Sequence, residues 1–150
     1  MLGKQSLKRV LIYSFTNFPY KHLLSRSVDF IFHHFNNDIE QFSLLIKEKN
    51  PELIIGIASS RSRNSYFESS AVNIFNKKRK IDKNGVPKYL LDYPTHGFDR
   101  IIVNNGYTDS FCNWTMYKIA QLIDGTETSL QFIHINQKDI EVLNQYLNEL

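Results

Sequence analysis

Four short, mostly apolar runs spread along the chain constrain its fold more than any other feature. They lie within residues 8–14, 53–57, 101–103 and 132–135. Their apolar residues are consecutive rather than alternating, which is typical of strands covered on both faces, as in a parallel sheet. Each run is far too short to cross a membrane. The pattern therefore favours a sheet that is buried between other layers.

Amphipathic helical patterns lie between these runs. Apolar residues recur at three- and four-residue spacing over 28–35, 39–46, 116–123 and 140–150. Asn37, with Glu40 three residues later, gives the second pattern a capping-box-like start. Strands that alternate with helices predict an α/β fold, a three-layer α/β/α sandwich with a mostly parallel central sheet. We expect a single domain over residues 1–150.

Composition narrows the class of protein. The 150 residues are 42% hydrophobic, carry a formal net charge of +3 and include one cysteine. A single cysteine excludes an internal disulfide, and a free thiol survives best in a reducing compartment. We expect a cytoplasmic protein with no membrane segment. Its small positive charge does not require an acidic partner.

Cys112 and His134 are the candidate catalytic pair. The cysteine follows the run at 101–103 and precedes the helical pattern at 116–123, while the histidine ends its own run. Reactive groups in open α/β sheets gather at the carboxyl ends of strands, so we expect both at one edge of the sheet. A helix N-terminus stabilises negative charge, which predicts a lowered pKa for the Cys112 thiol. The alternative is a small buried thiol and a core histidine.

Five segments, taken together, resemble pyroglutamyl peptidase I, a family of cysteine peptidases that remove N-terminal pyroglutamate. They occur in the family's order and span nearly the whole chain. The segments are Phe15-Thr16-Asn17-Phe18-Pro19, the strand 53–57 with Ala58, Glu68 with Ala71-Val72-Asn73, Cys112-Asn113 with Met116-Tyr117, and Phe132-Ile133-His134-Ile135.

The resemblance implies a catalytic triad. Cys112 would attack the pyroglutamyl carbonyl, His134 would act as base and then acid, and Glu68 would orient the imidazole. Arg79 would help to stabilise the oxyanion. No cofactor or metal is implied, and the partner would be a peptide with a blocked N-terminus.

Phe15 and Phe18 match the aromatic residues that enclose the substrate's lactam ring in the family. Other positions depart from the family pattern. The chain is shorter, and Thr108 replaces a glycine ahead of the cysteine. The catalytic positions therefore match better than the substrate pocket does.

Two other functions stay open. The altered loops also fit an inactive family member that acts as a binding or interaction module. Nucleic-acid binding would use the basic run 77–80 with Arg61 and Arg63, but no recognition motif accompanies it. His33 and His34 are adjacent on divergent positions, which fits no metal-ligand spacing. The oligomeric state is also open, with a homo-oligomer among the alternatives.

Overall fold

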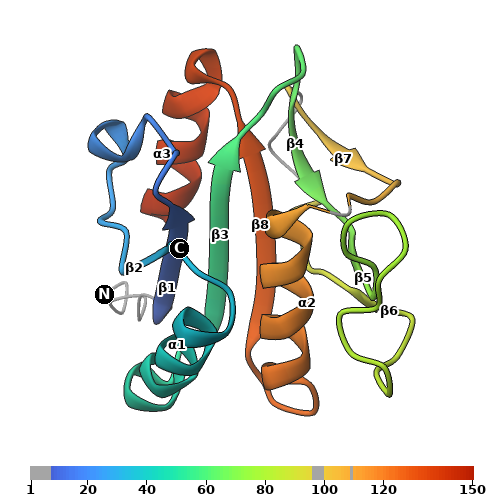
Figure 1. Cartoon of the computed structure of the whole chain (residues 1–150). Coiled ribbons are helices and arrows are strands. Elements are labelled where there is room, and N and C mark those ends of the chain that lie inside the picture. Colours follow the sequence, from blue (N-terminus) through green and yellow to red (C-terminus); the bar gives the residue numbers. More distant parts are fainter. Residues whose placement is uncertain (1–7, 96–99, 109) are drawn as a thin grey trace.

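A six-stranded sheet in the order β2-β1-β3-β8-β4-β7 forms the centre of the molecule (Figure 1). The computed structural model describes residues 8–95, 100–108 and 110–150. The strands of this sheet are β1 (Val10–Phe15), β2 (Phe30–Phe32), β3 (Leu53–Ser59), β4 (Ser65–Glu68), β7 (Ile101–Asn104) and β8 (Ser129–Ile135). Neighbouring strands are parallel except β4 and β8, which are antiparallel. The prediction of a mostly parallel sheet is confirmed.

Helices cover both faces of the sheet, which confirms the three predicted layers. They are α1 (Asn36–Lys49), α2 (Phe111–Ile123) and α3 (Ile140–Glu149), with short 3-10 turns η1 (Lys21–Leu23) and η2 (Gln137–Asp139). Phe42 of α1 and Met116 of α2 belong to one core cluster, while Leu143 and Leu147 of α3 belong to the other. None of the helices in the described part of the chain has the length and apolarity needed to cross a membrane.

Gly56 in the middle of β3 allows aromatic rings to pack tightly over the sheet. A Cβ atom at this position would overlap the side chains of Tyr13 and Phe132. Both rings are fully buried, and their centroids are 6.0 Å apart. The absence of a side chain here is therefore a packing requirement of the core.

The segment 65–74, predicted to be extended, contains two strands. β4 joins the central sheet, and β5 (Ser70–Val72) pairs with β6 (Lys88–Leu90) in a separate antiparallel ribbon. β5 packs beside α2. The chain therefore leaves the central sheet immediately after Glu68.

The predicted helix over 28–35 is wrong, because Phe30–Phe32 is a strand at the edge of the sheet, parallel to β1. The rings of Phe30 and Phe32 both pack on Phe42, with centroids 5.2 and 5.4 Å away. Aromatic residues suit a half-buried strand as well as a helix face, so the helical spacing was misleading.

The capping box predicted at the start of α1 is also absent. The helix begins at Asn36, with no side-chain capping bond at its N-cap. Instead the carboxylate of Asp38 accepts hydrogen bonds from the backbone N–H groups of His33 and His34, at 2.6 and 2.7 Å. This side chain stabilises the turn that precedes the helix.

Candidate active site

A cavity of about 560 Å³ lies at the carboxyl ends of β1, β3 and β8 and extends to the start of α2. We call it the Cys112 pocket. The described residues that line it are Phe15, Thr16, Asn17, Phe32, His33, Ala58, Ser59, Arg61, Tyr66, Thr108, Ser110, Phe111, Cys112 and His134. A second cavity of about 460 Å³ is lined by residues at the opposite ends of these strands, such as Glu52 and Ser129, and has no cysteine or histidine in its described lining. The two groups of the predicted catalytic pair therefore share one cavity.

Cys112 is the second residue of α2, and its neighbours fix the start of that helix. The side-chain amide of buried Asn113 donates to the carbonyl groups of Val72 and Ile74, both at 2.9 Å, and accepts from the Val72 N–H at 3.0 Å. The Thr115 hydroxyl donates to the Cys112 carbonyl at 2.7 Å. The thiol is thus held on a rigid helix end rather than on a loose loop.

Burial raises the pKa of the Cys112 thiol to about 11, against an ordinary value of 9.0. The nearby Glu68 acts in the same direction, while a hydrogen bond with Ser110 and the charge of Arg61 act against it. The expectation of a lowered pKa is therefore wrong, because the cost of desolvating a thiolate exceeds the benefit of the helix N-terminus. At neutral pH the resting thiol is protonated.

His134 lies on β8, where the sheet changes from parallel to antiparallel pairing. Its ring stacks on Tyr66, the residue opposite it on β4, with centroids 4.7 Å apart. Nδ1 lies 3.4 Å from the carbonyl oxygen of Ser59, and buried Nε2 has no hydrogen-bond partner among the described residues. Burial lowers the pKa of His134 to about 4. An imidazole that donates through Nδ1 leaves Nε2 free to accept a proton.

Glu68 is close enough to act on Cys112 electrostatically but is not among the residues that line the pocket. It follows Tyr66 by two residues on β4, so it projects from the same face and is a diagonal neighbour of His134. Its side chain is wholly buried, and Oε1 accepts a hydrogen bond from Asn104 Nδ2 at 2.8 Å. Oε2 has no hydrogen-bond partner among the described residues. Burial raises the pKa of this carboxyl.

The structure places two of the predicted site residues away from the Cys112 pocket. Phe15 lines it, but Phe18 packs against Tyr20, 5.6 Å between centroids, in the core cluster beneath α3. Phe18 therefore cannot form a wall of the pocket together with Phe15. Arg79 is exposed, in a turn whose backbone pairs with Phe75, and is not part of the lining. The guanidinium that does line the pocket belongs to Arg61.

Sequence reasoning missed several lining residues. Phe32 and Phe111 add aromatic walls, and Tyr66 covers one side of the His134 ring. Arg61 follows the end of β3 by two residues, so the rule that sites gather at strand carboxyl ends would have found it.

No protein-family model matches the sequence, and the search of curated proteins gives no match. The fold does match solved structures. Pyrrolidone carboxyl peptidase from Thermococcus litoralis aligns with a TM-score of 0.72 and 18% identity, over 86% of this chain and 76% of that chain. Pyroglutamyl peptidase I from Bacillus amyloliquefaciens aligns with a TM-score of 0.75 and 16% identity, over 95% and 92%.

A variant of the pyrrolidone carboxyl peptidase from Pyrococcus furiosus gives a TM-score of 0.67 and 16% identity, over 84% of this chain and 79% of that chain. The similarity extends over most of both chains in all three cases, despite the low identity. The chain therefore has the fold of the pyroglutamyl (pyrrolidone carboxyl) peptidases.

Proposed function

We propose that this chain is a divergent cysteine peptidase of the pyroglutamyl peptidase I type, which removes an N-terminal pyroglutamyl or similar cyclic residue from peptides. One observation carries the proposal: the Cys112 thiol and the His134 imidazole line one cavity in a chain with this fold. A free thiol also suits a reducing compartment such as the cytoplasm.

The first chemical step would be attack of Cys112 Sγ on the carbonyl carbon of the cyclic residue. His134 is the base, since its unpartnered Nε2 can take the thiol proton as the carbon–sulfur bond forms. Because the thiol pKa is raised, this proton transfer accompanies attack instead of preceding it. His134 then gives the proton to the departing amine, and water hydrolyses the thioester in the second half of the reaction.

The negative charge that develops on the substrate oxygen needs hydrogen-bond donors to stabilise it. The first backbone N–H groups of α2 have no acceptor within the helix, and the N–H of Cys112 is among them. Glu68, buried beside β8, would act as a positioning residue that favours the imidazolium form of His134. Its unpartnered Oε2 would supply this stabilisation of the imidazolium.

The pocket walls suit a flat, neutral ring. Phe15, Phe32, Phe111 and Tyr66 present aromatic side chains to the cavity. Aromatic faces bind a lactam through its flat surface, with few polar contacts needed to orient it. The substrate's cyclic residue would therefore lie among these rings, with its carbonyl directed at Cys112.

Cys112→Ser and His134→Ala should each reduce the hydrolysis of a pyroglutamyl-coumarin substrate by about 10³-fold or more. Both variants should keep the circular dichroism spectrum of the wild type. His22→Ala is the matched control, because His22 is exposed and outside the pocket lining, and it should keep full activity. Unchanged hydrolysis by Cys112→Ser would exclude a thiol mechanism.

The raised thiol pKa favours one second candidate, an inactive member that binds a cyclic N-terminal residue without cleaving it. Titration of wild-type protein with a pyroglutamyl peptide, followed by mass spectrometry, separates the two functions. A peptidase yields free pyroglutamate, whereas a binding module shows saturable binding with the peptide intact.

A further inference from the structure

The described lining of the Cys112 pocket includes one permanently charged side chain, that of Arg61. Arg61 is the single lysine or arginine among its described lining residues, and these include no aspartate or glutamate. The Arg61 guanidinium has no hydrogen bond or ion pair within the part of the chain that the structure describes, although its charge acts on Cys112. A cation without a carboxylate partner beside a candidate nucleophile is suited to an anionic group of a ligand.

Hydrogen bonds within residues 60–64 stabilise the loop that carries Arg61. The Ser60 and Ser62 hydroxyl groups both donate to the Asn64 carbonyl, at 2.6 and 2.9 Å. These bonds close residues 60–64 into a compact turn directly after β3.

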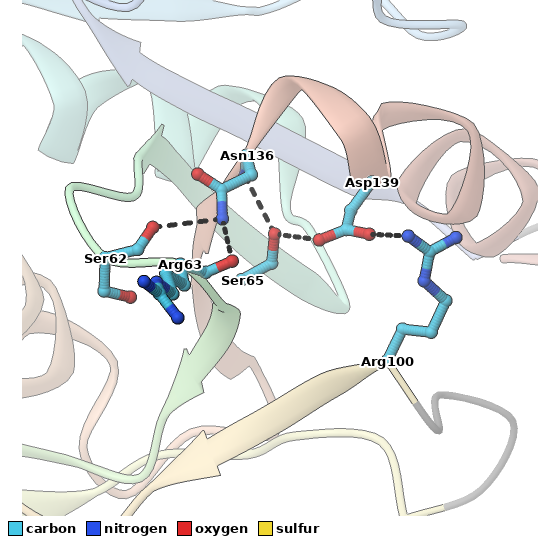
Figure 2. A network of polar contacts seen from close by, with 6 residues as sticks. All are labelled: Ser62, Arg63, Ser65, Arg100, Asn136 and Asp139. Atoms are coloured by element: carbon cyan, nitrogen blue, oxygen red, sulfur yellow. Dashed lines mark hydrogen bonds and ion pairs between the residues drawn. The ribbon is translucent and has the colours of Figure 1, made fainter.

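The same loop is also tied to the segment after β8 (Figure 2). Asn136 Nδ2 donates to the carbonyl groups of Ser62 and Arg63, at 3.2 and 2.9 Å. The Ser65 hydroxyl donates to buried Asp139 at 2.6 Å, and Asp139 pairs with Arg100 at 3.3 Å. Asp139 therefore already has its own partners, and the backbone around Arg61 is held in place on both sides.

The position of Arg61 indicates which part of a substrate it meets. Among the lining residues Arg61 is exposed, Cys112 is partly buried and His134 is buried, so we take Arg61 to mark the mouth of the pocket. The cyclic residue occupies the aromatic interior in the proposed function, so the residue after the cleaved bond extends towards the mouth. A guanidinium binds a carboxylate through two parallel hydrogen bonds, which makes it specific for that group.

We propose that Arg61 is a specificity residue that binds a carboxylate on the residue following the cleaved bond, so that the preferred substrates are acidic or carboxyl-terminated short peptides. This rests on the proposed peptidase function. The carboxylate has two sources, the free C-terminus of a dipeptide or the side chain of glutamate or aspartate.

Paired substrates separate these sources. Pyroglutamyl-alanine against pyroglutamyl-alaninamide tests a terminal carboxylate, and pyroglutamyl-glutamyl amide against pyroglutamyl-glutaminyl amide tests a side-chain one. In at least one pair, the wild type should have a kcat/KM roughly 10- to 100-fold higher for the substrate with the carboxylate. A factor of this size is typical of one hydrogen bond to a charged group. Arg61→Ala should abolish that preference, because it should lower kcat/KM for the carboxylate member of the pair by much more than for the neutral member.

Two control variants sharpen the result. Arg61→Lys keeps the charge but not the two-pronged geometry and should retain part of the preference. Arg63→Ala, two residues along the same loop and outside the lining, should retain all of it. Equal loss on charged and neutral substrates in Arg61→Ala would overturn the proposal, because it would assign Arg61 to the reacting atoms instead. Absence of any preference in wild type would also overturn it.

A readout that needs no peptidase activity keeps this inference separate from the proposed function. Cys112 can be alkylated with anionic iodoacetate or neutral iodoacetamide, and the ratio of the two rates reports the charge at the pocket. Arg61→Ala should lower that ratio by about 5- to 10-fold, whereas Arg63→Ala should not change it. A wild-type ratio equal to that of Arg61→Ala would show that the pocket does not attract anions. If hydrolysis is absent but the ratio falls as expected, the peptidase function fails, and with it the assignment of the carboxylate to the residue after the cleaved bond, while the attraction of anions by Arg61 is still shown.

Discussion

The two halves of the central sheet meet between β8 and β4 and differ in strand direction and, apart from the short edge strand β2, in strand length and burial. β1, β3 and β8 have six or seven residues, run parallel and are almost entirely buried. β4 and β7 have four residues each and run against β8, and Ile102 of β7 is 50% exposed. His134 and Tyr66 face each other where the halves meet. The long half thus contributes Phe15, Ser59 and His134 to the lining of the Cys112 pocket, and the short half contributes Tyr66.

Gly56→Ala should give the largest change in stability, because the new methyl group would overlap buried rings of the long half. We expect a loss of about 3 kcal/mol in the free energy of unfolding, measured by urea denaturation. Gly106→Ala, after β7, is the matched control: its Cβ would meet Asn104 Oδ1 at 3.4 Å, an ordinary contact. Equal losses of unfolding free energy in the two variants would show that the two halves do not differ in packing.

Acid should weaken the fold through His134. The folded chain lowers the pKa of this group from 6.5 to about 4, so between these values the unfolded chain binds a proton that the folded chain does not. Stability therefore falls as the pH falls from 6.5 to 4, by a total on the order of 3 kcal/mol. His134→Gln should lose this part of the pH dependence in thermal melts, whereas exposed His22→Gln should keep it. Identical slopes for wild type and His134→Gln would contradict the buried, neutral imidazole.

The Cys112 thiol should react slowly in the folded chain. A pKa of about 11 leaves far less thiolate at pH 8 than the ordinary value of 9.0 does. We expect iodoacetamide to label the folded protein roughly 10- to 100-fold more slowly than the urea-unfolded protein. Mass spectrometry over a range of pH values measures this. Fast labelling with an apparent pKa below 8 would instead support a thiolate stabilised by the helix N-terminus.

The smallest effect should come from trimming one methyl group in each half. Ile55→Val, on fully buried β3, should cost about 1 kcal/mol of unfolding free energy. Ile102→Val, half exposed on β7, should change it by less than about 0.5 kcal/mol. Differential scanning calorimetry under identical conditions compares the pair. A larger loss at Ile102 would mean that its exposed face is covered by a partner in solution.

Much of the fold was predictable because its long strands carry their own signal. The apolar runs at 53–57 and 132–135 lie within β3 and β8, and the helical patterns at 39–46 and 116–123 lie within α1 and α2. The helix expected over 28–35 is wrong because Val28, Ile31, Phe32 and Phe35 have helical spacing, although only Ile31 and Phe32 lie in the short edge strand. A strand of three residues is too short for its alternation to outweigh that pattern.

The structure brings some of the predicted site residues together and leaves others apart. Cys112, His134 and Phe15 share the pocket, and Glu68 lies beside it, but Phe18 and Arg79 do not line it. The choice between Arg79 and Arg61 depends on which loop the folded chain brings to the cavity. Residue type alone does not distinguish the two arginines.

The sequence by itself determined the alternation of strands and helices, since runs of apolar residues report which faces of a segment must be buried. It also determined the residue types available for a thiol–imidazole pair. Only the tertiary structure decided that β4 runs against β8, that Glu68 is a diagonal cross-strand neighbour of His134, and that the thiol pKa rises rather than falls. Strand direction and desolvation depend on contacts between segments that are distant in the chain, and local residue patterns do not encode those contacts.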